Sequence, residues 1–252
     1  MTTGQYGEFD RIRGEFREYV ARISNEAPWL GALQEKLRLS MGYDDYSIET
    51  PVVYNEALDD IGPRDQPRFI VVADNPGKNE QKASNRRYLV GQSGKLAQGW
   101  FLKELGMDFR ASSLIINKTP IHTPKTAEIG RMRKIAKDES ARRAVELDRL
   151  LDESQRRMAR FAFEIHSCLG GVLWVSGYGE LKPKGLFSAW AEEITSLYAG
   201  ASPALRDSVW VFRHFSMNQC AIEYKQFEGR AKEPMAKLAA IGTANRKRIL
   251  GW

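Results

Sequence analysis

Four short apolar runs, rich in β-branched residues, set the strongest limit on what this chain can fold into. They are FIVVA at residues 69–73, LIIN at 114–117, VLWVS at 172–176 and VWVF at 209–212. None of them alternates between apolar and polar residues, which is typical of parallel strands that are covered on both faces. Helical patterns fill the intervals between the runs. The sequence therefore predicts a three-layer α/β/α fold with a mostly parallel four-stranded sheet.

The helices that cover this sheet are predicted from the spacing of apolar residues. Apolar residues recur at helical spacing over 8–24, 30–37, 93–105 and 186–197, and a last helix is expected from about residue 233. Ser93 is the expected N-cap of the third helix, and Gly106 its end. Residues 1–42 form an N-terminal helical layer, 43–67 a long loop, and 126–165 a two-helix insertion in a crossover. We expect one domain over residues 1–252.

Composition narrows the class of protein without identifying it. The net charge is +6, which fits a polyanionic partner but is also found in basic enzymes that bind no nucleic acid. No apolar stretch approaches the roughly 20 residues of a membrane span, and the start MTTGQYGEFDR lacks secretory features. We therefore expect a cytoplasmic protein, with access to a nucleoid or nucleus, and no membrane partner.

Cysteine and histidine usage argues against a metal centre. The only two cysteines, Cys168 and Cys220, exclude a disulfide framework and a four-cysteine cluster, and both are expected to be buried apolar filler. The three histidines, His122, His166 and His214, lie far apart in the sequence and outside any metal-binding motif. No metal and no cofactor are expected.

Polar residues follow the predicted strands directly. Asp74 and Asn75 follow the first strand, Asn117 closes the second, Ser176 closes the third, and His214 and Ser216 follow the fourth. The carboxyl ends of parallel strands lie along one edge of a sheet, where ligands of open α/β folds bind. A carboxylate, two carboxamides, an imidazole and hydroxyls are therefore expected to converge on this edge.

The order of these motifs resembles the uracil-DNA glycosylase superfamily. ADNPG at 73–77 looks like the family's GMNPG or GINPG water-activating loop, and YLVGQSG at 88–94 looks like the PFVGxxG segment of its thermophile-type branch. Asn117 resembles the strand-end Asn that reads the uracil edge, and HFS at 214–216 looks like the H-P-S motif. The resemblance covers roughly residues 69–218. Ala73, Phe215 and Leu89 depart from the family's Gly, Pro and uracil-stacking aromatic residue, and the branch's four cluster cysteines are missing.

This resemblance implies a monofunctional DNA glycosylase that removes uracil or a related deaminated base by base flipping, in base excision repair. It implies that Asn75, or Asp74, holds the attacking water and that His214 acts on the leaving base. Base binding is assigned to Asn117, Tyr88 and Leu89. DNA contacts are assigned to Gly91, Ser93, Gly94, Ser216 and Asn218. The expected partner is DNA that carries the damaged base, and the expected state is a monomer.

Each assignment has a structural alternative. Asn75 before Pro76 is also typical of an Asx turn, and Asp74 of a loop salt bridge. Asn117 is also consistent with capping a strand end, and His214 with a hydrogen-bonded core histidine. Tyr88 and Leu89 are also typical of plain core, which for Leu89 is the preferred interpretation.

Two further functional interpretations are not adopted. Residues 246–248 are expected to be a solvated helix end rather than a DNA contact. The segment 91–95 is not a P-loop, because Leu89 replaces its first glycine and Leu96 follows Lys95.

Two other functions compete with the glycosylase hypothesis. One is a glycosylase-fold protein that engages DNA, or a protein partner, with little or no cleavage. The other is a small-molecule nucleoside hydrolase, which needs no basic rim for DNA.

Overall fold

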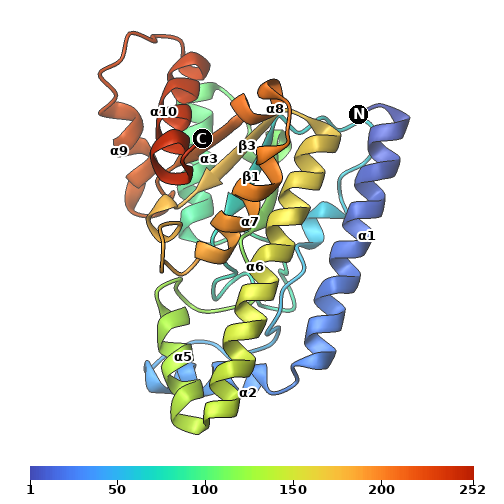
Figure 1. Ribbon diagram of the computed structural model, residues 1–252, viewed down its shortest axis with the longest axis vertical. Coiled ribbons are helices and arrows are strands. Elements are labelled where there is room, and N and C mark those ends of the chain that lie inside the picture. The colour runs from blue at the N-terminus through green and yellow to red at the C-terminus, as the bar shows by residue number, and fades with distance from the viewer.

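A single all-parallel sheet of four strands forms the centre of the computed structural model, which describes residues 1–252 (Figure 1). Its strands are β1 (Phe69–Ala73), β2 (Ser113–Asn117), β3 (Val172–Ser176) and β4 (Val209–Phe212), in the spatial order β2-β1-β3-β4. Ala73 pairs with Asn117, and Ser176 with Phe212. The predicted strands are confirmed to within one residue, and their carboxyl ends share one edge of the sheet.

Helices cover both faces of the sheet. On one side lie α6 (Ala141–Leu169), α1 (Thr3–Glu26) and α7 (Ser188–Ala199), and on the other α3 (Gln92–Leu105), α9 (Gln219–Lys225) and α10 (Pro234–Leu250) (Figure 1). The helices α2 (Leu30–Ser40) and α5 (Glu128–Glu139) lie together below the sheet in this view. Short α4 (Phe109–Ser112) and α8 (Pro203–Asp207) precede β2 and β4. The α/β fold with a parallel four-stranded sheet is confirmed, and the two helices α5 and α6 lie between β2 and β3 in the chain.

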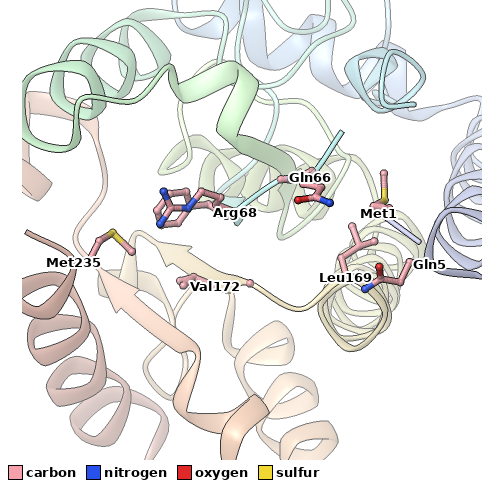
Figure 2. A pocket seen from close by; sticks show the side chains of 10 residues that line it. Met1, Gln5, Gln66, Arg68, Leu169, Val172 and Met235 are labelled. Atoms are coloured by element: carbon pink, nitrogen blue, oxygen red, sulfur yellow. The ribbon is translucent and has the colours of Figure 1, made fainter. Parts of the chain in front are cut away.

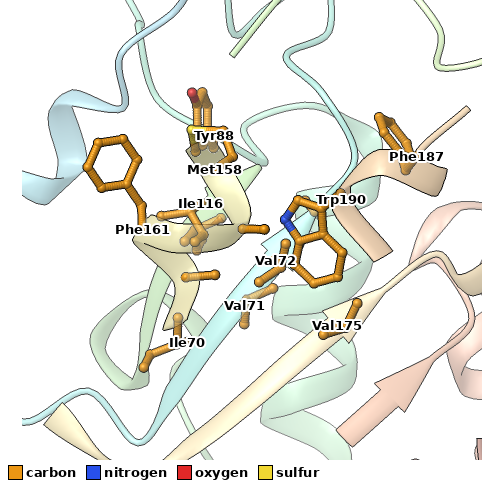
Figure 3. Close-up of a cluster of buried hydrophobic side chains, with 14 of the residues drawn as sticks. Ile70, Val71, Val72, Tyr88, Ile116, Met158, Phe161, Val175, Phe187 and Trp190 are labelled. Carbon is orange, nitrogen blue, oxygen red and sulfur yellow. The ribbon is translucent and has the colours of Figure 1, made fainter. Parts of the chain in front are cut away.

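The strands are apolar throughout because both faces of the sheet are buried. Trp174 of β3 stacks on Phe212 of β4 with ring centroids 4.0 Å apart, and Phe101 of α3 packs against it. On the opposite face, side chains from β1, β2 and β3 meet α6 and α7. That cluster includes Val72, Ile116, Val175, Met158, Phe161 and Trp190 (Figure 3).

Helix boundaries differ from the sequence prediction in two places. The N-cap of α3 is Gly91, so Ser93 lies inside the first turn and caps nothing, which corrects its predicted role. Gly106 ends the helix in the left-handed conformation, as predicted. Leu186 lies before α7. The long loop contains a short 3-10 helix, η1 (Glu56–Leu58), and one bridge between Val52 and Ile121.

Two predictions about single residues were also wrong. Arg246 is only 3% exposed, and its guanidinium donates to the Arg206 and Trp252 carbonyls and to Asp207, so it is not a solvated helix end. Cys220 is buried as expected, but Cys168 is only half-buried and its Sγ donates to the Gln5 carbonyl.

None of the helices has both the length and the apolar content that crossing a lipid bilayer requires.

Candidate active site

Asp74 and a lysine that the sequence analysis left unassigned form a buried ion pair where β1 and β2 end. Lys118 Nζ donates to Asp74 Oδ1 at 2.6 Å and to the Ser176 carbonyl at 2.5 Å. Thr126 donates to Asp74 Oδ2 at 3.2 Å. The Lys118 side chain is fully buried, and burial lowers its pKa while Asp74 raises it. Both oxygens of Asp74 are therefore occupied, which favours the salt-bridge interpretation over a water-activating base.

Asn75 presents one free acceptor at the same edge. Its Nδ2 donates to Thr123 Oγ1 at 2.8 Å, and the carbonyls of Thr123 and Pro76 lie 3.3 Å away. These contacts fix the amide so that Oδ1 faces away from Thr123, and this oxygen is buried without a partner. A carbonyl oxygen in this state is able to accept a hydrogen bond from a water molecule.

Asn117 and Ser176 add further unsatisfied groups at neighbouring strand ends. Asn117 is 1% exposed, and neither Oδ1 nor Nδ2 has a partner. Ser176 Oγ is also buried and unpartnered. Buried polar groups are nearly always hydrogen-bonded, because leaving one unpaired costs about 1–3 kcal/mol. Such a concentration at one edge is typical of a site that binds a polar ligand.

The ring orientation of His214 is fixed by the residue two positions later. The backbone N–H of Ser216 donates to His214 Nδ1 at 3.0 Å, and Ser216 Oγ lies 2.8 Å from the same atom. A backbone N–H only donates, so Nδ1 is an acceptor and the proton of the neutral ring sits on Nε2. Burial lowers the pKa of His214 below its usual 6.5; Asp74 raises it and Lys118 lowers it. His214 is thus a neutral Nε2 donor in the electrostatic field of the ion pair.

Phe215, the middle residue of the HFS segment at 214–216, anchors this loop. It is 2% exposed and stacks on Trp174 with an interplanar angle of 19°. Phe101 and Phe109 pack edge-on against the same ring. The aromatic ring therefore holds His214 and Ser216 in place from the core side.

The structure does not support base stacking by Tyr88. Its side chain is fully buried, lies with Met158 and Phe161 of α6, and donates to the Val53 carbonyl at 2.5 Å (Figure 3). Leu89 is 4% exposed, which confirms the core interpretation, and has a φ of +55°. The side chains of these two residues therefore lie in the core behind the candidate site and do not line it.

Glycine 94 is required by the shape of this segment. A Cβ at Gly94 would lie 1.4 Å from the Leu89 carbonyl oxygen, so no other residue fits there without moving the chain. Arg110 donates to the carbonyls of both Tyr88 and Leu89 and so also holds this segment in place. Gly94 therefore serves close packing of backbone on backbone rather than contact with DNA.

Among the other residues assigned to DNA, Gly91 and Ser93 lie at the start of α3 and are half-buried. The Ser216 hydroxyl is hydrogen-bonded to His214, and Asn218 is exposed with a φ of +55°. Between them Met217, which the sequence analysis missed, is 77% exposed with a φ of +52°. An exposed apolar side chain on a left-handed backbone is unusual and costs stability. It is available for contact with a partner.

A cleft of about 520 Å³ lies at the opposite end of the sheet (Figure 2). Arg68, Val172 and Met235 are among its lining residues, and none of the predicted site residues is. Fold position and unsatisfied groups, rather than cleft size, therefore point to the carboxyl edge.

Lys118 was missed because burying a lysine contradicts its usual exposure. The available signal was a cation directly after β2, next to the carboxylate that follows β1.

The His, Cys, Asp and Glu side chains form no cluster of three or more that could hold a metal ion. Comparison with protein-family models, curated proteins and solved structures gives no match.

Proposed function

We propose that this protein hydrolyses the N-glycosidic bond of uracil, or a related deaminated base, in DNA. The observation that carries the proposal is the buried carboxamide of Asn117, whose donor and acceptor both lack partners. A pyrimidine edge presents a matching acceptor and donor to such an amide. Asn117 is 1% exposed, so the base enters only if the loops around it open.

The reaction divides between His214 and Asn75. Water attacks C1′ of the sugar, the bond from C1′ to the base nitrogen breaks, and the electron pair leaves with the base. The water oxygen becomes the hydroxyl on C1′, and the proton that it releases ends on the departing base. His214 Nε2–H donates to the carbonyl oxygen of the departing base, where negative charge develops. Asn75 Oδ1 accepts a hydrogen bond from the water and aims it. The products are the free base and an abasic site.

Exposed cations supply a route for the phosphate backbone. Lys95, Lys182 and Lys184 are exposed and belong to segments that follow β1 and β3. Neutralising phosphates releases counterions, so binding should weaken steeply as salt rises.

The test is excision from oligonucleotides that carry uracil, hypoxanthine, xanthine or hydroxymethyluracil, with alkali-labile abasic sites as the readout. We expect abasic sites with at least one of these bases, and their loss in His214→Ala. His166→Asn is the matched control, since His166 is a buried histidine bonded to Tyr198 rather than to the site. Absence of abasic sites with every substrate contradicts the proposal.

A second candidate is a glycosylase-fold protein that binds DNA without cleaving it. It is favoured by the hydrogen bonds that Asp74 accepts from Lys118 and Thr126, which leave this carboxylate engaged and unsuited to base catalysis. Salt-sensitive DNA binding without abasic sites would select this candidate. Hydrolysis of free deoxyuridine with a flat salt response would instead indicate a nucleoside hydrolase.

A further inference from the structure

Glu80 is a buried carboxyl group that the proposed reaction does not use. It is 8% exposed and follows the 73–77 loop by three residues. Its Oε2 accepts a hydrogen bond from the Gly77 amide at 3.1 Å, while the Glu80 amide donates back to the Gly77 carbonyl at 3.1 Å. This reciprocal pair closes the turn that follows Asn75 and Pro76.

The same carboxyl group also faces the second segment of the site. The backbone amides of Leu89 and Val90 lie close enough to lower its pKa, as does the charge of Arg110. Arg110 in turn donates to the carbonyls of Tyr88 and Leu89. One acidic and one basic side chain therefore hold the amides and carbonyls of the 88–90 segment.

The residue next to Glu80 makes a matching connection to a third segment. Gln81 is fully buried, and its Oε1 accepts from the Glu49 and Thr50 amides at 2.7 and 3.1 Å. Its Nε2 donates to the Ser47 carbonyl at 2.8 Å. Residues 80 and 81 thus join three separate stretches of chain behind the candidate site.

We propose that Glu80 is a positioning residue: its carboxylate holds the 73–77 loop against the 88–90 segment and so keeps Asn75 in place. The Gly77 N–H donates to this carboxylate, and the N–H groups of Leu89 and Val90 lie near it. An ionised carboxylate accepts such N–H groups with both oxygens, whereas a protonated carboxyl turns one oxygen into an O–H donor and loses acceptor capacity. The contact should therefore weaken on protonation. The effect of this contact on catalysis rests on the proposed function, whereas the contact itself does not.

Burial raises the pKa of Glu80 to about 7, although the three amides and Arg110 lower it. Tyr88 also faces Glu80, and burial raises its pKa well above 10. His122, bonded to the Pro76 carbonyl, also titrates in acid, but burial lowers its pKa to about 4, and burial lowers the pKa of His214 below 6.5. A transition near pH 7 at these amides is therefore specific to Glu80.

The experiment is an NMR titration of the ¹⁵N-labelled full chain from pH 5.5 to 8.5. We expect the Gly77, Leu89 and Val90 amide resonances to shift together with one midpoint near pH 7. Glu80→Gln should remove this transition, and Glu49→Gln should keep it. Glu49 is the matched control because its exposed carboxylate accepts a single amide, that of Ala83.

Excision rates supply the second readout. In the wild type and in Glu49→Gln, kcat/KM should decrease as pH falls through 7. In Glu80→Gln this decrease should be absent, and excision at pH 8 should be about tenfold slower than in the wild type. Three amides that shift at unrelated midpoints in the wild type, or a transition that survives in Glu80→Gln, overturn the proposal. The shared transition without any excision would leave Glu80 as a positioning residue and refute the glycosylase function alone.

Discussion

Lys118 Nζ lies 2.6 Å from Asp74 Oδ1, and this buried ion pair joins the carboxyl ends of β1 and β2. The two residues are 44 positions apart in the sequence. The backbone repeats the connection, since the Lys118 amide donates to the carbonyls of Ala73 and Asp74 at 2.9 and 3.0 Å. The pair leaves no spare volume, because a Cβ at Gly177 would lie 2.6 Å from Asp74 Oδ1. The candidate site therefore lies on a tightly packed, buried ion pair that connects the ends of β1 and β2.

Asp74→Asn should destabilise the fold by about 3 kcal/mol, because removing one partner leaves the other buried and uncompensated. Lys118→Met should also destabilise it. The double variant should be less destabilised than the sum of the two, since neither charge then remains unpaired. Urea unfolding of all four proteins measures this, and strict additivity would show that the pair contributes no coupling.

His214→Ala and Asn75→Ala should each slow single-turnover excision by about 10²–10³-fold, the usual effect of losing one transition-state hydrogen bond. DNA affinity should change little, because neither side chain is assigned to a phosphate. Ser216→Ala removes only one of two contacts that orient the imidazole, so we expect a loss of about tenfold. If both His214→Ala and Asn75→Ala excised the base at the wild-type rate, the assignment would be wrong and other residues would carry out the reaction.

Met217→Ala should reduce excision from duplex DNA by about tenfold and leave single-stranded substrate nearly unaffected. The reason is that an exposed apolar side chain beside the site is placed to fill the gap that an extruded base leaves in the stack. Exposed Leu102 on α3 offers a control: Leu102→Ala should leave both rates unchanged. Equal losses on both substrates would show that Met217 acts on the pocket instead.

Acid should destabilise the protein through its buried neutral histidines. Burial lowers the pKa of both His122 and His166 to about 4, while the unfolded chain binds these protons near pH 6.5. The unfolded state therefore holds more protons between pH 6.5 and 4, and stability falls as pH falls. Each histidine contributes about 1.4 kcal/mol per pH unit. Glu80, with its pKa raised to about 7, has the opposite effect. Between pH 4.5 and 7 the folded state holds its proton more tightly than the unfolded state, which offsets the stability loss from one histidine.

The measurement is urea unfolding at pH 6.0, 5.5 and 5.0. We expect a net loss of about 1.4 kcal/mol per pH unit in the wild type. His166→Asn should flatten this slope, even though it lowers the stability at pH 7 by disrupting the bonds to Tyr198 and Ser208. An unchanged slope would mean that His166 titrates normally in the folded protein.

The strands and most helices were predictable because their signals are local. Four unalternating runs appear where both faces of the sheet are buried, and α6 repeats its apolar residues at helical spacing. Strand ends also place Asn75, Asn117 and His214 along one edge, as parallel pairing requires. By contrast, the partner of Asp74 depends on β1 and β2 pairing, and no local pattern encodes that. Tyr88 was misjudged for the same reason: whether an aromatic ring faces core or ligand depends on what lies behind it, here α6.

The roles of the glycines were equally hidden in the sequence, and two positions in α3 offer a matched test. Gly94→Ala should destabilise the protein by at least about 2 kcal/mol, since the new Cβ would lie 1.4 Å from the Leu89 carbonyl oxygen. Gly99, five residues further along the same helix, is exposed and has nothing within 4 Å of an added Cβ. Gly99→Ala should therefore stabilise the protein by up to about 1 kcal/mol through helix propensity alone.

Urea unfolding of the two variants separates a packing role for Gly94 from the DNA contact first assigned to it. A packing role predicts that Gly94→Ala loses stability without any DNA present, and that amide exchange quickens at residues 88–94. A pure DNA-contact role predicts near-normal stability and exchange with weaker binding. Because Arg110 holds the Tyr88 and Leu89 carbonyls against α3, the chain has little freedom to retreat from the added methyl group. We therefore expect the stability loss, and with it displacement of the segment that Glu80 ties to the 73–77 loop.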